Sequence, residues 1–212
     1  MDRAGRVIAA LVSEGVNVVA APLPLTTLAE DAAALDRSLS RLEGPVVLAG
    51  HAYAGAVIAE TRSKNVKSLV YVTALAPDER EKVADVFYRL PPHPDAPKLA
   101  PDHNGLIWLP DTAFKSAFAQ HATEDDLAVI AAVQRPISLA CITTPVGRPL
   151  WKDVPSWFLI AEDDRMILPE TQHFMAERMK AQVRRHAVDH APIVTAPHVV
   201  VEIIREAIRS AA

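Results

Sequence analysis

The sequence is poor in cysteine and in aromatic residues, and it has no long apolar run. Its one cysteine, Cys141, excludes an internal disulfide, and a chain without disulfides suits a reducing compartment, so we expect it in the cytoplasm. No apolar stretch approaches the roughly 18 residues of a membrane span, and the polar residues 1–6 do not resemble a signal peptide. We therefore expect no membrane partner.

Positive charge is also scarce. The chain has 22 Lys and Arg against 26 Asp and Glu, a formal net charge of −4. Nucleic-acid binding needs a concentrated basic face, and the local cluster of Arg184 and Arg185 is too small to form one, so we expect no nucleic-acid partner. Half of the residues are hydrophobic and 23% are charged, which is typical of a globular protein, and 212 residues suffice for one structural domain.

Apolar periodicity predicts alternating strands and helices. Helices are expected at 6–13, 28–42, 169–181 and 197–210, and strands at 16–22, 45–50, 66–74, 155–162 and 182–188. This alternation predicts the α/β class, with a mostly parallel sheet flanked by helices. The strand at 45–50 is continuously apolar between Gly44 and Gly50, so we expect both of its faces to be buried.

The rhythm breaks in a proline-rich segment, residues 78–150. Two helices are expected there, near 111–121 and 124–134. We interpret 78–150 as a helical cap inserted into a core made of 1–77 and 151–212. The aromatic residues expected to lie in the core or to line a pocket are Trp108, Phe114, Phe118 and Trp151.

The stretch PVVLAGHAYAGAVIAE, residues 45–60, has the pattern of a nucleophile elbow. In that motif, G-x-S-x-G, a strained turn between a strand and a helix exposes a serine hydroxyl, and small residues flank it. Gly50 and Ala54 fill the small positions, but the centre is Ala52, whose methyl group cannot attack a carbonyl. A plain strand-turn-helix would explain the glycine but not the whole pattern.

Two further segments complete the order of a catalytic triad. AEDDRMI, residues 161–167, follows a buried strand and offers Asp164 as the acid, although a solvated turn would also explain the acidic triplet. DHAPIVTAP, residues 189–197, offers His190 in a loop before the last helix. Nucleophile, acid and histidine in this chain order are typical of α/β-hydrolases.

Nearly the whole chain resembles the small bacterial α/β-hydrolase-fold esterases, relatives of plant methylesterases and hydroxynitrile lyases. Those proteins typically read V-G-H-S-Y-G/A-G-A at the elbow, P-S-W-Y-L-V with a D-R-M-I turn at the acid, and S-H-x-x-x-x-S-x-P before the last helix. This sequence has GHAYAGA, PSWFLIAEDDRMI and DHAPIVTAP. The resemblance implies that Asp164 is the acid, that His190 is the base and that the backbone N–H of Tyr53 is one oxyanion donor.

The sequence departs from the family in two places. Ala52 replaces the nucleophile, and the chain begins at the helix that follows the family's first strand and its H-G loop, which supplies the other oxyanion N–H. The resemblance therefore implies half an oxyanion hole and an empty slot in the sheet, between the strands expected at 16–22 and 45–50. Such a sheet must close up or borrow a strand, and our hypothesis is a homodimer across this region.

Other polar residues carry weaker expectations. His51 and Tyr53 flank the elbow and are candidates for ligand contact. Residues next to such a turn, however, more often support the turn than touch a ligand. Cys141 is expected to be a small buried hydrophobe rather than a substitute nucleophile. We expect no cofactor, and no metal, since no metal-binding spacing relates the remaining histidines His121, His173, His186 and His198.

Three functional hypotheses remain at this point. The first is an esterase for a small, fairly apolar ester or acyl substrate, its hydrolysis abolished or very weak because of Ala52. The second is a non-catalytic protein that binds or senses a small molecule in a pocket under the cap. The third is that Ala52 was introduced by design or that the chain start was misassigned. A lyase using His190 without a covalent intermediate is a further variant.

Overall fold

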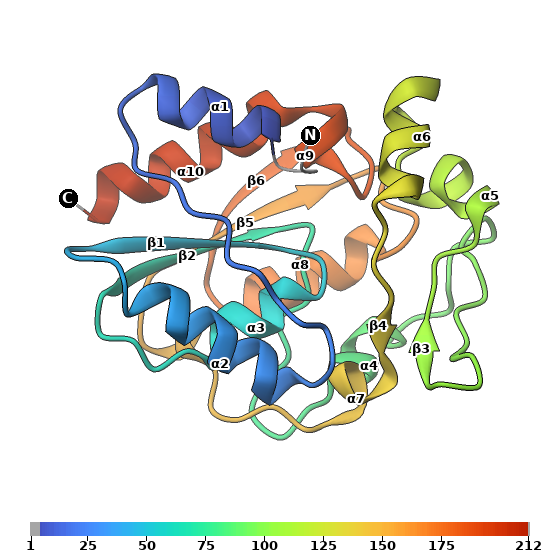
Figure 1. The fold of residues 1–212 in the computed structure, drawn as a ribbon, viewed down its shortest axis with the longest axis horizontal. Helices are drawn as coiled ribbons and strands as arrows, with labels where there is room; N and C mark the ends of the chain where they lie inside the picture. Colours follow the sequence, from blue (N-terminus) through green and yellow to red (C-terminus); the bar gives the residue numbers. More distant parts are fainter. Residues whose placement is uncertain (1–4, 212) are drawn as a thin grey trace.

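The computed structural model describes residues 5–211, and its centre is a parallel sheet (Figure 1). The strands are β1 (Val46–His51), β2 (Val66–Val72), β5 (Ser156–Ala161) and β6 (Gln182–His186). They pair in the order β1-β2-β5-β6, and each of these pairs is parallel. This confirms the α/β class and the parallel sheet flanked by helices.

Helices cover both faces of this sheet (Figure 1). One face carries α1 (Gly5–Ser13) and α10 (Pro197–Ala211), and the other carries α2 (Leu28–Leu39), α3 (Ala54–Glu60) and α8 (Pro169–Arg178). Neighbouring residues of the central strands belong to opposite sides: Trp157 packs in the cluster of α1 and α10, and Phe158 packs in the cluster of α2, α3 and α8. This alternation follows from the period of two in a strand.

The strand expected at 16–22 is not formed. Residues 16–22 run as an extended segment without strand structure, and the backbone of 17–22 makes no hydrogen bond to another described residue. Its β-branched residues favour an extended backbone locally, but a strand also needs a partner within hydrogen-bond distance. The expectation was therefore wrong, because β1 does not lie close enough to pair with this segment.

As a consequence, β1 is an edge strand in the described part of the chain. Ala49 is exposed, and Val46 and Val47 are half-buried, so the expected burial of both faces was wrong for this strand. The sequence of β1 is as apolar as that of a central strand, because helices pack on both faces of the sheet at this position. What β1 lacks is a neighbour on one side.

Residues 78–150 form short elements beside the carboxyl end of the sheet (Figure 1). They are α4 (Val83–Phe87), β3 (Leu106–Ile107), α5 (Asp111–Ala113), a π-helix (Phe114–Phe118), α6 (Glu124–Ala132), β4 (Ile137–Ser138), α7 (Leu139–Thr143) and the start of a 3-10 helix (Leu150–Lys152). The expected helix 111–121 is thus a short α-turn followed by a wider π-turn. The assignment of this segment as a cap stays a prediction.

Some elements are shorter than the sequence predicted. Thr73 has a positive φ of 44°, so β2 ends at Val72 rather than at residue 74, and α2 ends at Leu39 rather than at 42. The loop after β6 contains an additional short helix, α9 (Pro192–Thr195). Across residues 5–211, no helix combines the length and the apolar character that crossing a bilayer requires.

Candidate active site

The turn after β1 holds Ala52 in a left-handed conformation, with φ of 50°. Such a backbone costs an L-residue roughly 1–2 kcal/mol, so it must be held by its surroundings. The N–H of Ala52 donates to the carbonyl of Val72 (3.4 Å), and the carbonyl of Ala52 accepts from the N–H groups of Gly55 (3.2 Å) and Leu75 (3.0 Å). The turn therefore has the strained geometry of the expected elbow, with a methyl group at its centre.

Two glycines let the elbow pack closely. A Cβ at Gly50 would lie 2.7 Å from the carbonyl oxygen of Ala54, and a Cβ at Gly55 would lie 2.5 Å from that of Leu75. The sequence pattern identified Gly50 as a required small residue. It overlooked Gly55, although this second glycine also stands in the GHAYAG motif.

Asp164 and His190 form a buried pair. Nδ1 of His190 lies 2.8 Å from Oδ2 of Asp164, and the two residues are 3% and 2% exposed. Oδ1 of Asp164 accepts from the backbone N–H groups of Met166 (2.8 Å) and Ile167 (2.9 Å), which fixes the carboxylate. Because Nδ1 faces the carboxylate, Nε2 is the ring nitrogen left to act on a ligand, and no hydrogen bond joins it to another described residue.

Gln172, on α8, supports this pair and was not singled out from the sequence. Its side-chain amide donates to Oδ2 of Asp164 (2.8 Å) and to the carbonyl of Ile167 (2.7 Å), and its carbonyl oxygen accepts from the N–H of Ala161 (3.1 Å). The residue is fully buried. A glutamine in a helix that begins at Pro169 gives no sequence signal that it holds Asp164.

The backbone at His190 is held by the neighbouring strand ends. Its carbonyl oxygen lies 2.6 Å from Nε2 of His51 and accepts a 3.1 Å hydrogen bond from the hydroxyl of Thr73. The rings of His51 and His190 lie 4.9 Å apart. His51 precedes Ala52 directly, so these contacts bring the elbow and the histidine loop to the same edge of the sheet, and His51 supports the loop.

A buried carboxylate, Asp189, fixes the same loop from the other side. It accepts from the N–H groups of His121 (2.9 Å) and Ala191 (3.1 Å) and from the hydroxyl of Thr195 (2.7 Å). Sequence reasoning passed over Asp189, because an acid beside the candidate histidine is indistinguishable from a surface residue. Through His121, it ties segment 78–150 to the histidine loop.

Tyr53 uses its side chain away from the elbow. Its hydroxyl donates to Oδ2 of Asp31 (2.8 Å), a fully buried residue that also accepts from the N–H of Leu25 (2.7 Å). Burial and this contact hold the pKa of the Tyr53 hydroxyl above its usual range. The backbone N–H of Tyr53 donates to no acceptor in residues 5–211, which leaves it available for the expected oxyanion.

Cys141 is buried, as expected, and is not isolated from polar groups. Its Sγ lies 3.8 Å from Oδ2 of Asp31. Burial raises the pKa of the thiol to about 11, so little thiolate forms near neutral pH. This matches a small hydrophobe rather than a nucleophile.

Aromatic side chains stand beside the histidine. The ring of Phe118 lies 5.2 Å from that of His190 and 6.3 Å from that of His51, and Phe114 lies edge-on to Phe118 at 5.7 Å. Phe114 and Trp151 are buried as expected, whereas Trp108 is 46% exposed and does not belong to the core. Phe118 therefore forms an apolar wall next to His190.

Among the described residues, the remaining histidines belong to no cluster of metal-binding side chains. His121 and His173 lie near single carboxylates, Asp163 at 3.8 Å and Glu162 at 3.7 Å. No group of three or more His, Cys, Asp or Glu in residues 5–211 is arranged to hold a metal ion.

A family model described as the alpha/beta hydrolase family matches residues 4–203. The alpha/beta hydrolase nvfD of Aspergillus novofumigatus (strain IBT 16806) is 28% identical over 204 residues, which cover 87% of this chain and 79% of that protein.

Two solved structures share the fold. Polyneuridine aldehyde esterase superposes with a TM-score of 0.80 at 18% identity, covering 96% of this chain and 92% of that one. Tomato methylketone synthase I, complexed with 2-tridecanone, superposes with a TM-score of 0.82 at 17% identity, covering 99% and 93%. Identities this low establish the common architecture alone.

Proposed function

Because this chain belongs to the alpha/beta hydrolase family, we propose that it derives from an esterase for small, fairly apolar esters and that Ala52 abolishes or strongly weakens its hydrolysis. The observation that carries the proposal is the pairing of Asp164 with His190 at 2.8 Å, beside an elbow whose central residue has φ of 50°. In this proposal His190 is the base and Asp164 is the acid that orients it. The group that they would activate is absent.

The proposed ancestral reaction assigns one role to each residue. A serine at position 52 would attack the ester carbonyl while Nε2 of His190 accepts its proton, and Asp164 would stabilise the imidazolium. The N–H of Tyr53 would donate to the oxyanion. In the present chain the first step has no attacking atom, and loss of a triad nucleophile costs about a millionfold in turnover.

Ala52→Ser tests this proposal directly. We expect the serine variant to hydrolyse p-nitrophenyl acetate and butyrate at least about a thousandfold faster than the chain as given. The matched control is Ala128→Ser on the exposed side of α6, which should change nothing.

The double variant Ala52→Ser with His190→Gln supplies the second control. It should lose the gained activity, because the hydroxyl then has no base. Equal turnover in the single and double serine variants would contradict the proposed roles, since the hydrolysis would not pass through the histidine.

A binding protein is the alternative function. A cavity of about 430 Å³ supports it, formed between residues 87–99 of the proposed cap and Met166 and Leu168, just after Asp164. Mostly apolar side chains line this cavity, including Phe87, Leu90, Pro92 and Leu99. Saturable binding of an unhydrolysable apolar ketone such as 2-tridecanone, with no turnover in the chain as given or in Ala52→Ser, would favour this function.

A reaction without an acyl-enzyme is a second candidate for catalysis. It is favoured by a paired base beside an elbow that has no nucleophile, and one structural neighbour is a methylketone synthase solved with the ligands 2-tridecanone and β-ketoheptanoate. A β-keto acid loses CO₂ by cleavage of the bond between its carboxylate carbon and Cα, and the resulting enolate takes a proton at Cα. In this candidate reaction, His190 would deliver that proton.

The same variants separate this candidate from the esterase. β-Ketoheptanoate would be followed for release of 2-hexanone, with the spontaneous rate subtracted. Turnover in the chain as given that disappears in His190→Gln would favour decarboxylation, and a rate equal to the spontaneous one in both would exclude it.

A further inference from the structure

The cavity of about 430 Å³ beside residues 87–99 is mostly apolar and has a rigid backbone. Met166 and Leu168 line it from the turn after the candidate acid, and Leu99 lines it from segment 87–99. Three prolines of that segment also line it: Pro92, Pro94 and Pro97. Because a proline ring fixes φ, this part of the lining keeps its shape without a ligand and loses little backbone entropy when one binds.

Arg165 holds segment 87–99 against the turn that follows β5. Its guanidinium donates to Oδ2 of Asp95 (2.9 Å) and to the carbonyl of Ser116 (2.8 Å). Asp95 is the single acidic residue of 87–99, and it does not line the cavity. The charge of this carboxylate is thus offset by Arg165, which weakens its repulsion of an anion in the cavity.

Among the described residues that line the cavity are two donors and no carboxylate. Lys98 is exposed, and its ammonium group forms no ion pair with another described residue. His93 supplies the second donor. Its Nδ1 accepts from the N–H of Asp95 (3.0 Å), so the neutral ring carries its proton on Nε2. A carboxylate group has two oxygens that can accept from these two side chains.

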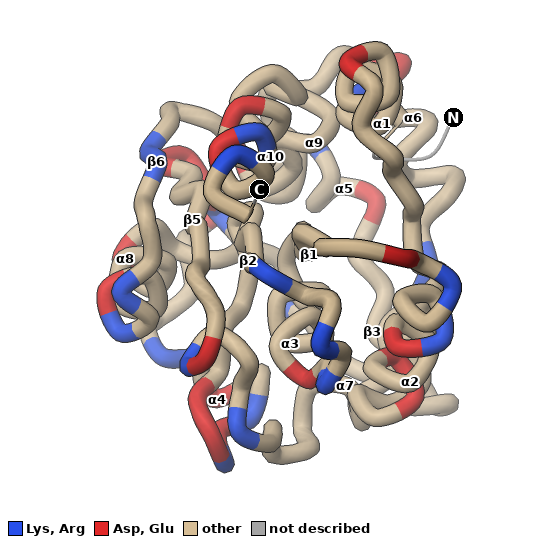
Figure 2. The backbone as a smooth tube through the Cα atoms, turned by 90° about the vertical axis from the view of Figure 1, so that its left-hand side faces the viewer, with Lys and Arg blue, Asp and Glu red and all other residues tan. Residues whose placement is uncertain are grey.

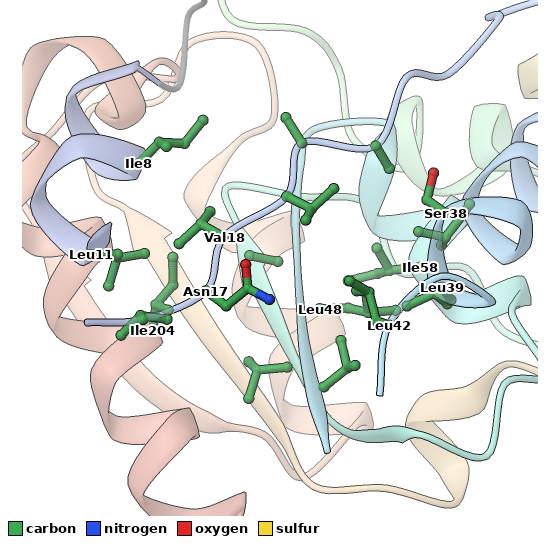
Figure 3. A pocket seen from close by; sticks show the side chains of 18 of the residues that line it. Ile8, Leu11, Asn17, Val18, Ser38, Leu39, Leu42, Leu48, Ile58 and Ile204 are labelled. Carbon is green, nitrogen blue, oxygen red and sulfur yellow. The ribbon is translucent and has the colours of Figure 1, made fainter. Parts of the chain in front are cut away.

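The cavity between β1 and the extended segment 16–21 has the opposite charge (Figure 3). Its volume is about 610 Å³, and Glu43 is the single charged side chain among the described residues that line it. The backbone along β1 carries no Lys or Arg (Figure 2). This larger cavity disfavours an anion. An anionic ligand therefore distinguishes the two cavities, whereas an uncharged apolar one does not.

We propose that the cavity beside 87–99 binds a medium-chain carboxylate, with the carboxylate group at Lys98 and His93 and the alkyl chain along the apolar residues. The inference rests on the alternative function, small-molecule binding, and adds the chemical class of the ligand. At roughly 30 Å³ per water-sized group, the volume of about 430 Å³ accommodates at most about fourteen non-hydrogen atoms. Octanoate and decanoate are within this limit, and tetradecanoate exceeds it.

A series of chain lengths tests the apolar part of the site. Isothermal titration calorimetry with the whole chain should show saturable binding of octanoate at one site. Decanoate should bind about tenfold more tightly, because each buried methylene strengthens binding about three- to fourfold. The gain per methylene should stop once the alkyl chain exceeds the cavity, so tetradecanoate should bind no more tightly than dodecanoate.

A charge variant tests recognition of the carboxylate. Lys98→Gln should weaken octanoate binding about three- to tenfold. It should leave the binding of octan-1-ol unchanged, because the alcohol has no charge with which Lys98 could pair. Lys64→Gln is the matched control, since Lys64 is exposed in the turn before β2, at the opposite end of the sheet, and it should change neither affinity.

A second variant locates the ligand. Leu99→Asp puts a carboxylate into the lining and should abolish octanoate binding. Leu139→Asp, at an exposed position of α7, should not change it. Circular dichroism establishes that each variant is folded.

Three results would overturn the proposal. Equal effects of Lys98→Gln on octanoate and octan-1-ol would show that the cavity does not recognise the carboxylate, and the alternative function would still stand if 2-tridecanone binds. Octanoate binding that survives Leu99→Asp would place the ligand elsewhere. If neither octanoate nor 2-tridecanone binds the folded chain, the alternative function fails together with this inference.

Discussion

Gln172 donates its hydrogen bond to Oδ2 of Asp164, the same carboxylate oxygen that faces Nδ1 of His190. The Gln172 amide thereby fixes one oxygen of the carboxylate, while the backbone N–H groups of Met166 and Ile167 hold its other oxygen. The acid is positioned without help from the residue at 52. This explains how the pair persists beside an elbow that carries only a methyl group.

Gln172→Ala should lower the free energy of unfolding by about 2–4 kcal/mol, because the N–H of Ala161 and the carbonyl of Ile167 lose their partner inside the protein. Urea unfolding followed by circular dichroism measures the change. Gln182→Ala is the control, since Gln182 is exposed at the start of β6. A loss at Gln172 no larger than at Gln182 would contradict the proposed support.

Tyr71→Phe should raise the free energy of unfolding by about 1–3 kcal/mol. The Tyr71 hydroxyl is fully buried and has no hydrogen-bond partner among the described residues, whereas its ring stacks on Phe158 at 5.6 Å and would remain. Tyr88→Phe, at a residue that is 54% exposed, should change stability by less than about 0.5 kcal/mol. A destabilised Tyr71→Phe would mean that the hydroxyl is satisfied.

The same residue gives a pH dependence. Burial raises the pKa of Tyr71 above its ordinary value of 10.0. Above pH 10 the unfolded chain releases this proton while the folded chain keeps it, so the contribution to stability is complete below pH 10 and decreases as the pH rises. Unfolding measured between pH 9 and 11 should therefore show a smaller alkaline loss in Tyr71→Phe than in the parent chain.

Ala52→Gly should leave the free energy of unfolding unchanged or raise it by about 1 kcal/mol. Glycine relieves the cost of φ at 50°, which offsets its greater freedom in the unfolded chain. Ala128→Gly, in the exposed middle of α6, has no such relief and should lose about 1 kcal/mol. Thermal unfolding compares the two, and equal losses would show that the turn at Ala52 is unstrained.

Cys141 should react with iodoacetamide at least about a hundredfold more slowly in the folded protein than in urea, because the thiolate is the reacting form. Burial raises the pKa of this thiol from 9.0 to about 11, so the folded rate should keep rising with pH where the unfolded rate levels off. Mass spectrometry counts the single adduct. Rapid labelling of the folded protein would place the thiol in contact with solvent.

The strands at 66–72 and 156–161 could be predicted because continuous apolar runs between turn residues indicate central strands. The segment at 16–22 has similar composition, yet it is not a strand. Pairing depends on what lies beside a segment in space, and local sequence does not contain that information.

The residues of the candidate site likewise fall into two groups, those that the sequence could predict and those that it could not. Ala52, Asp164 and His190 could be placed from motifs whose spacing is local, and the structure brings Asp164 and His190 into contact. Gln172, Asp31 and Asp189 could not, because each is a polar residue in a helix or loop that looks like a surface position. Their burial arises from contacts with residues far along the chain.

The π-helix at Phe114–Phe118 holds one residue more per turn than an α-helix would, and the N–H of Ala119 closes the wider ring on the carbonyl of Phe114 at 2.8 Å. Each α-helical residue advances by about 100°, so removing one residue here would rotate everything after it by roughly that angle. The ring of Phe118 would then no longer lie beside the imidazole of His190. Chain length in this one turn, rather than the identity of any side chain, decides which group stands over the histidine.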